Sequence, residues 1–154
     1  MVKVLVVYDT RYGNTKLVAE TIVEGIKEIV RAEAVLKVIQ QVESAELLDY
    51  DLILIGSPNH YGVPTKEIKE FILGLEETGL EGKRGAVFDT YLGAGFFEKA
   101  VRWAEKRIRE KVPGLKLIAP GLSIRVEKSR GPIAEGELHK CREFGRKIAD
   151  QLNA

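Results

Sequence analysis

Six consecutive residues near the start of the chain have the types and spacing needed to bind an anion. They are Thr10-Arg-Tyr-Gly-Asn-Thr15, and they stand between an apolar run, Val2–Tyr8, and an amphipathic stretch. A strand, a tight loop and a helix in this order aim backbone N–H groups and the positive end of a helix dipole at a ligand above the strand. The two threonines and the asparagine add hydroxyl and amide donors, and Gly13 lets the backbone approach closely. These residues predict a phosphate site.

The same loop lacks two better-known phosphate signatures. It has no Gly-Lys-Ser/Thr ending, which argues against a nucleoside triphosphate, and no Gly-x-Gly-x-x-Gly, which argues against a dinucleotide. What remains suits one terminal phosphate. The alternative is a helix N-cap without a ligand, and Arg11 either adds positive charge to the site or points to solvent.

Apolar runs separated by amphipathic stretches supply the elements that must position this loop. Runs typical of buried strands are followed by helical spacing of apolar residues, and the last strand is interrupted at Pro120-Gly121. The expected strands are Val2–Tyr8, Glu33–Ile39, Tyr50–Gly56, Lys83–Phe88 and the pair Leu115–Ile118 and Leu122–Val126. The expected helices begin near Thr15, Pro64 and Phe96, and the last runs over Ala134–Leu152.

This alternation predicts an α/β fold with a parallel sheet and helices on both faces. In such sheets ligands bind beyond the carboxyl ends of the strands. The loops Ser57–Gly62 and Asp89–Gly95 follow the third and fourth strands and carry glycine with polar and aromatic side chains, as the first loop does. We therefore expect these three loops to converge on one crevice.

Composition fits one domain over residues 1–154 and excludes several classes of function. Charged residues make up 31% of the chain, yet the net charge is only +1, and no polybasic run favours nucleic acid or an anionic membrane. No apolar run approaches the length of a membrane span, and one cysteine, Cys141, indicates a reducing, cytoplasmic setting. The wealth of Glu, Lys and Arg leans towards a thermophile. Two histidines are too few for a His-rich metal site.

The Thr-x-x-Gly-Asn-Thr pattern after a first buried strand resembles the phosphate loop of the flavodoxin family. Asp9–Thr15 is particularly similar to the flavin-binding domain of flavodiiron proteins, and Ser57-Pro-x-x-x-Gly62 extends the resemblance along the chain. The resemblance implies a flavodoxin-like three-layer sandwich with a five-stranded parallel sheet of order 2-1-3-4-5. It also implies FMN as the cofactor, without the metal-bearing half of a flavodiiron protein.

The resemblance assigns roles to the three loops. Thr10–Thr15 would hold the phosphate, Tyr61 and Tyr91 would sandwich the isoalloxazine ring, and Gly62 would let its peptide rearrange beside the ring. The complete set of expected cofactor-binding residues is Thr10, Arg11, Tyr12, Gly13, Asn14, Thr15, Ser57, Pro58, Asn59, His60, Tyr61, Gly62, Asp89, Thr90, Tyr91, Leu92 and Gly93.

Three of these residues have alternatives. Asp89 departs from the small or neutral residue usual in the family, and its carboxylate either lies near the reduced pyrimidine or caps the following loop and faces away. His60 either bonds the flavin or a partner, or is an exposed loop residue. Tyr91 either stacks on the ring or packs half-buried.

The expected function is that of an FMN-binding electron carrier, which docks transiently with redox proteins over the exposed ring edge. One alternative is an FMN-dependent NAD(P)H or quinone reductase, which needs a pocket for a second flat substrate. The other is a flavodoxin-like module without FMN.

Overall fold

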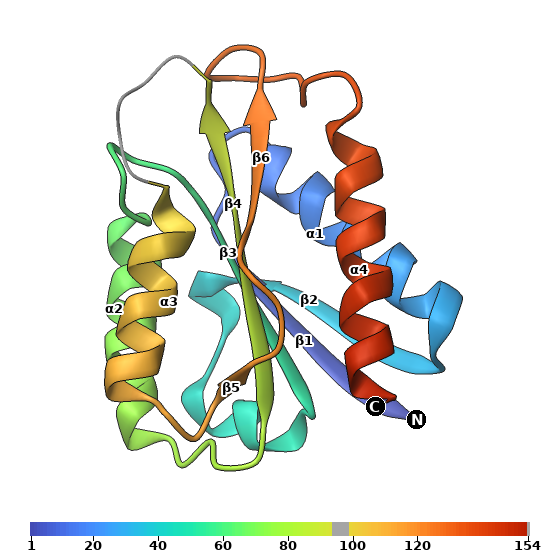
Figure 1. Ribbon diagram of the computed structural model, residues 1–154. Helices are drawn as coiled ribbons and strands as arrows, with labels where there is room; N and C mark the ends of the chain where they lie inside the picture. The colour runs from blue at the N-terminus through green and yellow to red at the C-terminus, as the bar shows by residue number, and fades with distance from the viewer. Residues whose placement is uncertain (94–98, 154) are drawn as a thin grey trace.

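The computed structural model describes residues 1–93 and 99–153, which form a central parallel sheet with helices on both faces (Figure 1). The order β2-β1-β3-β4 is followed by β5 and β6, which pair with β4 at successive positions. The strands are β1 (Val2–Tyr8), β2 (Ala32–Val38), β3 (Leu52–Pro58), β4 (Arg84–Leu92), β5 (Lys116–Leu117) and β6 (Leu122–Val126). This confirms the expected class and the order 2-1-3-4-5, with one interrupted strand in the fifth place.

The interruption between β5 and β6 lies at the predicted position. Arg84 of β4 is in register with Lys116, and Phe88 of β4 is in register with Leu122. Between them, a Cβ added to Gly121 would lie 2.6 Å from Cβ of Val101, so this stretch passes too close to the neighbouring helix for a side chain.

Two pairs of helices cover the sheet. The helices are α1 (Asn14–Ile29), α2 (Lys66–Gly74), α3 (Ala100–Lys111) and α4 (Glu137–Leu152), with short 3₁₀ turns at Ile39–Gln41, Ser44–Asp49 and Leu75–Glu77. Helices α1 and α4 pack on one face of the sheet and α2 and α3 on the other (Figure 1). Each face has its own apolar core, and β1 supplies both because its residues Val4–Val7 are fully buried and alternate between them.

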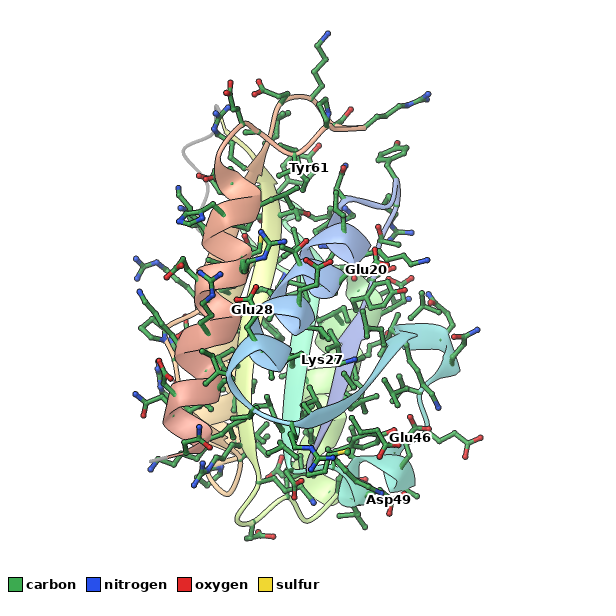
Figure 2. The ribbon with its side chains drawn as sticks, turned by 90° about the vertical axis from the view of Figure 1, so that its right-hand side faces the viewer. Glu20, Lys27, Glu28, Glu46, Asp49 and Tyr61 are labelled. Atoms are coloured by element: carbon green, nitrogen blue, oxygen red, sulfur yellow. The ribbon has the colours of Figure 1, made fainter. Side chains whose placement is uncertain are left out.

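Helices α1 and α4 approach closely because glycines face each other across their contact. A Cβ on Gly145 would lie 2.1 Å from the carbonyl oxygen of Ile22, and one on Gly25 would lie 2.1 Å from that of Arg142. At the solvent edge, Arg142 Nη2 donates to Glu24 Oε2 at 2.7 Å, and Arg146 pairs with Glu28. Figure 2 shows Glu28 on α1 beside α4.

Several expected boundaries differ from the structure. The fourth strand continues to Leu92 rather than ending at Phe88, because Asp89 and Thr90 stay paired with β3 while Tyr91 pairs with β6. The last helix begins at Glu137, after Gly136 in the left-handed region with φ 83°. The second helix begins at Lys66, two residues after Pro64, and the start expected near Phe96 lies outside the described residues.

Within the described part of the chain, none of the helices is both long and apolar enough to span a bilayer.

Candidate cofactor site

A cavity of about 720 Å³ opens at the carboxyl ends of β1, β3, β4 and β6. Its volume lies within the range of about 300–1,000 Å³ that is typical of sites for small molecules. The residues that line it are Thr10, Arg11, Tyr12, Asn14, Thr15, Pro58, Asn59, His60, Tyr61, Thr90, Tyr91, Leu92, Gly93, Lys99, Val126 and Ser129. The three loops expected to converge therefore do meet at one cavity.

The loop after β1 forms an open helix N-terminus on one side of the cavity. Gly13 precedes α1 with φ 89°, and its N–H donates to Thr10 Oγ1 at 2.9 Å. Among the described residues, none caps α1 with a side-chain hydrogen bond, and its first turn contains no acidic residue. The first N–H groups of the helix and its positive dipole end therefore face the cavity without an internal anion, which favours a ligand phosphate.

The side chain of Thr15 connects this loop to β4. Thr15 is 1% exposed, and its Oγ1 lies 3.0 Å from Thr90 Oγ1. Both residues line the cavity, and their contact holds the start of α1 against β4.

The loop after β3 is a tight turn held by its own polar groups. Gly62 N–H donates to Asn59 Oδ1 at 2.7 Å, and His60 and Val63 exchange two backbone hydrogen bonds. The turn places Tyr61 at φ 54°, where a residue with a side chain is strained, and leaves it 83% exposed. His60 is likewise exposed and lines the cavity.

Ser57 lies behind this loop rather than in the cavity wall. It is 3% exposed, its Oγ donates to the Pro58 carbonyl, and the same Oγ accepts the Thr65 N–H at 2.9 Å. It therefore supports the loop and does not reach the cavity.

Tyr91 and Lys99, at the end of β4 and just before α3, also line the cavity. Tyr91 is half-buried at the end of β4, and the Lys99 ammonium lies 4.5 Å from the centre of its ring. The cation–π contact holds a positive charge at the cavity wall.

Asp89 takes the position expected under the capping alternative. It is fully buried and outside the cavity lining, and its Oδ2 accepts the Val101 N–H at 3.1 Å near the start of α3. Burial raises the pKa of Asp89 to about 6, although the Val101 N–H, Ser123 and Lys99 favour the charged form. A direct contact between this carboxylate and a ligand is therefore not supported.

All other expected residues line the cavity except Gly13 and Gly62, which shape the backbone of their turns. Arg11 reaches the wall, and its guanidinium lies 3.9 Å from Asp9 and 3.6 Å from Glu67, so its charge is offset there.

Three lining residues were missed by sequence reasoning: Lys99, Val126 and Ser129. Val126 ends β6, which was expected only as a strand, and Ser129 lies in the loop after it. That loop packs against the start of α1, because a Cβ on Gly131 would lie 2.6 Å from Asn14 Oδ1. All strands of a parallel sheet have their carboxyl ends at the same edge. The loop after the last strand could therefore have been expected to border the cavity.

Outside the cavity, the thiol of Cys141 belongs to the apolar core. Cys141 is fully buried on α4, and burial raises the pKa of its thiol to about 12, so it stays a protonated core residue. Among residues 1–93 and 99–153, His, Cys, Asp and Glu form no group able to hold a metal ion.

Comparison with known proteins decides the family. A family model described as a flavodoxin domain matches residues 5–125. The chain belongs to the flavodoxin family. The flavodoxin of Aquifex aeolicus is 29% identical, with 97% of this chain and 86% of that protein covered. The crystal structure of oxidised flavodoxin 2 from Bacillus cereus superimposes with a TM-score of 0.83 at 32% identity, covering 97% of this chain and 99% of that one.

The expected similarity to the flavin domain of flavodiiron-type proteins is also confirmed. The type A flavoprotein fprA of Rhodobacter capsulatus is 32% identical over 96% of this chain. The chain spans only 33% of that relative's length. Flavodoxins are electron-transfer flavoproteins, so membership assigns the chain a flavin cofactor and redox partners.

Proposed function

We propose that residues 1–154 act as one FMN domain that carries electrons between redox proteins. The observation that carries this proposal is the pairing, in one cavity, of an uncapped helix N-terminus with a wall of tyrosines. The first suits a phosphate and the second suits a flat aromatic ring, and FMN joins the two.

The phosphate would lie at the start of α1. Backbone N–H groups of the first turn, with the hydroxyls of Thr10 and Thr15 and the amide of Asn14, line that side of the cavity. These donors are neutral, which suits a monophosphate stabilised by a helix dipole. Riboflavin, which has no phosphate, would lose all of these contacts.

The ring would lie between Tyr61 and Tyr91, from the loop after β3 and the end of β4. When bound, FMN accepts and donates electrons, while the protein orients the ring and shapes its surroundings. The turn at Asn59–Gly62 provides backbone groups at the ring edge, and Gly62, with φ 93°, lets the neighbouring peptide rearrange.

Electron carriage is favoured over turnover of a second substrate. Tyr61 is 83% exposed and Leu92 54% exposed, so the ring edge would face a docking protein. Steady oxidation of NAD(P)H by the FMN-loaded chain, at a rate set by the chain, would instead support the reductase.

The discriminating experiment compares FMN with riboflavin. Flavin fluorescence quenching gives both dissociation constants for the natural chain and for the double variant Thr10→Ala/Thr15→Ala. We expect the natural chain to bind FMN at least about a hundredfold more tightly than riboflavin. The complex with riboflavin lacks the several hydrogen bonds that the charged phosphate of FMN would accept. The variant should lose most of that preference. Equal affinities in the natural chain would overturn the proposal.

A further inference from the structure

The residues that line the cavity include exposed apolar side chains. Tyr12, Tyr61 and Leu92 are 55%, 83% and 54% exposed, and all three line the cavity. They come from the loops after β1 and β3 and from the end of β4, so the turns at this edge of the sheet gather them. Exposed aromatic and aliphatic side chains gathered around a cavity are typical of a surface that contacts another protein.

One side of the mouth is positively charged. Lys99 lies over Tyr91, and Lys128 and Arg130 are exposed on either side of Ser129, which lines the cavity. The Arg130 guanidinium lies 5.5 Å from the centre of the Tyr12 ring, so the loop after β6 reaches across towards the loop after β1. We call Lys99, Lys128 and Arg130 the cationic rim.

In the part of the chain that the structure describes, the three side chains of the cationic rim form no ion pair with a carboxylate: none has a carboxylate oxygen within 4.0 Å. Glu127 pairs with Arg125 at 3.9 Å, and Asp89, which lies near Lys99, is fully buried. Among residues 1–93 and 99–153, the side chains that line the cavity include no Asp or Glu.

We propose that this mouth docks a redox protein that presents an acidic surface around its own redox centre, an inference that rests on the proposed FMN site. The net charge of the chain is only +1, so any steering must come from the local field of the rim. The exposed apolar side chains would exclude water from the contact, and the cationic rim would select the sign of the partner's charge.

The test measures electron transfer with two protein probes of opposite charge. A reduced acidic 2Fe–2S ferredoxin gives one electron to the oxidised FMN-loaded chain, and a basic cytochrome c takes one electron from the reduced chain. Stopped-flow rates are followed from about 20 to 300 mM NaCl, where the Debye length shortens several-fold. We expect the ferredoxin rate to fall on the order of tenfold with salt, and the cytochrome c rate not to fall.

Charge-reversal variants test whether the cationic rim causes the salt dependence of the ferredoxin rate. Lys128→Glu/Arg130→Glu should remove most of the salt dependence with ferredoxin. The control Lys27→Glu/Lys147→Glu changes the net charge equally, and it should keep the natural dependence. Lys27 lies in the last turn of α1 and Lys147 lies on α4; Figure 2 shows Lys27 well away from Tyr61.

The outcomes that overturn the inference are distinct from a failure of the proposed function. An absorption spectrum first establishes that each variant binds FMN. If the natural chain binds no FMN, the proposed FMN site is wrong, and the inference that rests on it is wrong as well. If FMN is bound, a ferredoxin rate that rises with salt indicates a basic partner. If Lys128→Glu/Arg130→Glu weakens FMN binding but leaves the salt dependence of the ferredoxin rate unchanged, these two cations act on the cofactor phosphate and not on the partner. Either result overturns the acidic-partner proposal.

Discussion

Thr15 Oγ1 and Thr90 Oγ1 lie 3.0 Å apart in a buried contact that joins the start of α1 to β4. Thr90 thereby orients a hydroxyl on the phosphate side of the cavity. We expect Thr90→Val to weaken FMN binding on the order of tenfold, because the Thr15 hydroxyl loses its partner, and to weaken riboflavin binding less. Fluorescence titration with both flavins measures the ratio.

Thr90→Ser should restore the natural ratio in that experiment. Thr21→Val provides a matched control, since Thr21 is a buried threonine whose hydroxyl donates to the Leu17 carbonyl within α1. A Thr90→Val variant with the natural preference for FMN would show that the contact only holds the two elements together.

A substitution at Tyr91 tests the contact with the flavin ring separately from the contacts with the phosphate. We expect Tyr91→Leu to weaken FMN and riboflavin equally, by about three- to tenfold, because one stacked aromatic contact contributes roughly 0.5–1.5 kcal/mol. Titration with both flavins should give lower affinities at an unchanged ratio. A change confined to FMN would place Tyr91 at the phosphate instead.

Asp89 predicts a specific pH dependence of stability. Burial raises its pKa from 3.8 to about 6 in the folded chain. Because the folded value is the higher, the protonated residue favours folding below about pH 4, and this contribution is lost as the pH rises through 6. Asp89→Asn should therefore be more stable than the natural chain above pH 6, by about 1–3 kcal/mol.

Denaturant unfolding of both chains between pH 4 and 8 measures that difference. The difference between the two unfolding free energies should be smallest near pH 4 and should grow as the pH rises towards 7. A pH-independent difference would mean that the pKa of the folded carboxyl is close to its ordinary value.

Two Gly→Ala substitutions, at Gly145 and at Gly74, test the close packing of α1 against α4. Gly145→Ala should destabilise the chain by about 1–3 kcal/mol or more, since the new Cβ would lie 2.1 Å from a backbone carbonyl of α1 that cannot easily move. Gly74→Ala, in α2, has no atom within 4 Å of the new Cβ and should stabilise by about 0.5–1 kcal/mol. Thermal unfolding compares them, and equal shifts would contradict the close α1–α4 contact.

The α/β class and the loop after the first strand could be predicted because strands and loops repeat a local pattern, whereas the sheet order followed only from the resemblance to the flavodoxin family. Val4–Val7 are buried on both faces, which requires helices on both sides, and the loop after them shows its donors directly in the sequence. The end of β4 was harder to predict. Asp89, Thr90 and Gly93 have loop chemistry, and only the pairing partners on both sides extend the strand through Leu92.

Other parts of the site depend on contacts between distant residues. Lys99 lines the cavity through its approach to the Tyr91 ring, and Arg130 reaches Tyr12 across more than a hundred residues of sequence. The burial of Asp89 follows from the start of α3 packing over it. No spacing rule within the sequence specifies these distances.

The most direct test of the account is a visible absorption titration of the flavin-free chain with FMN. We expect saturation at one FMN per chain, with flavin bands shifted by the tyrosines that line the cavity and with flavin fluorescence quenched. A flat titration, or binding that riboflavin matches with equal affinity, would contradict the assignment of the cavity to FMN.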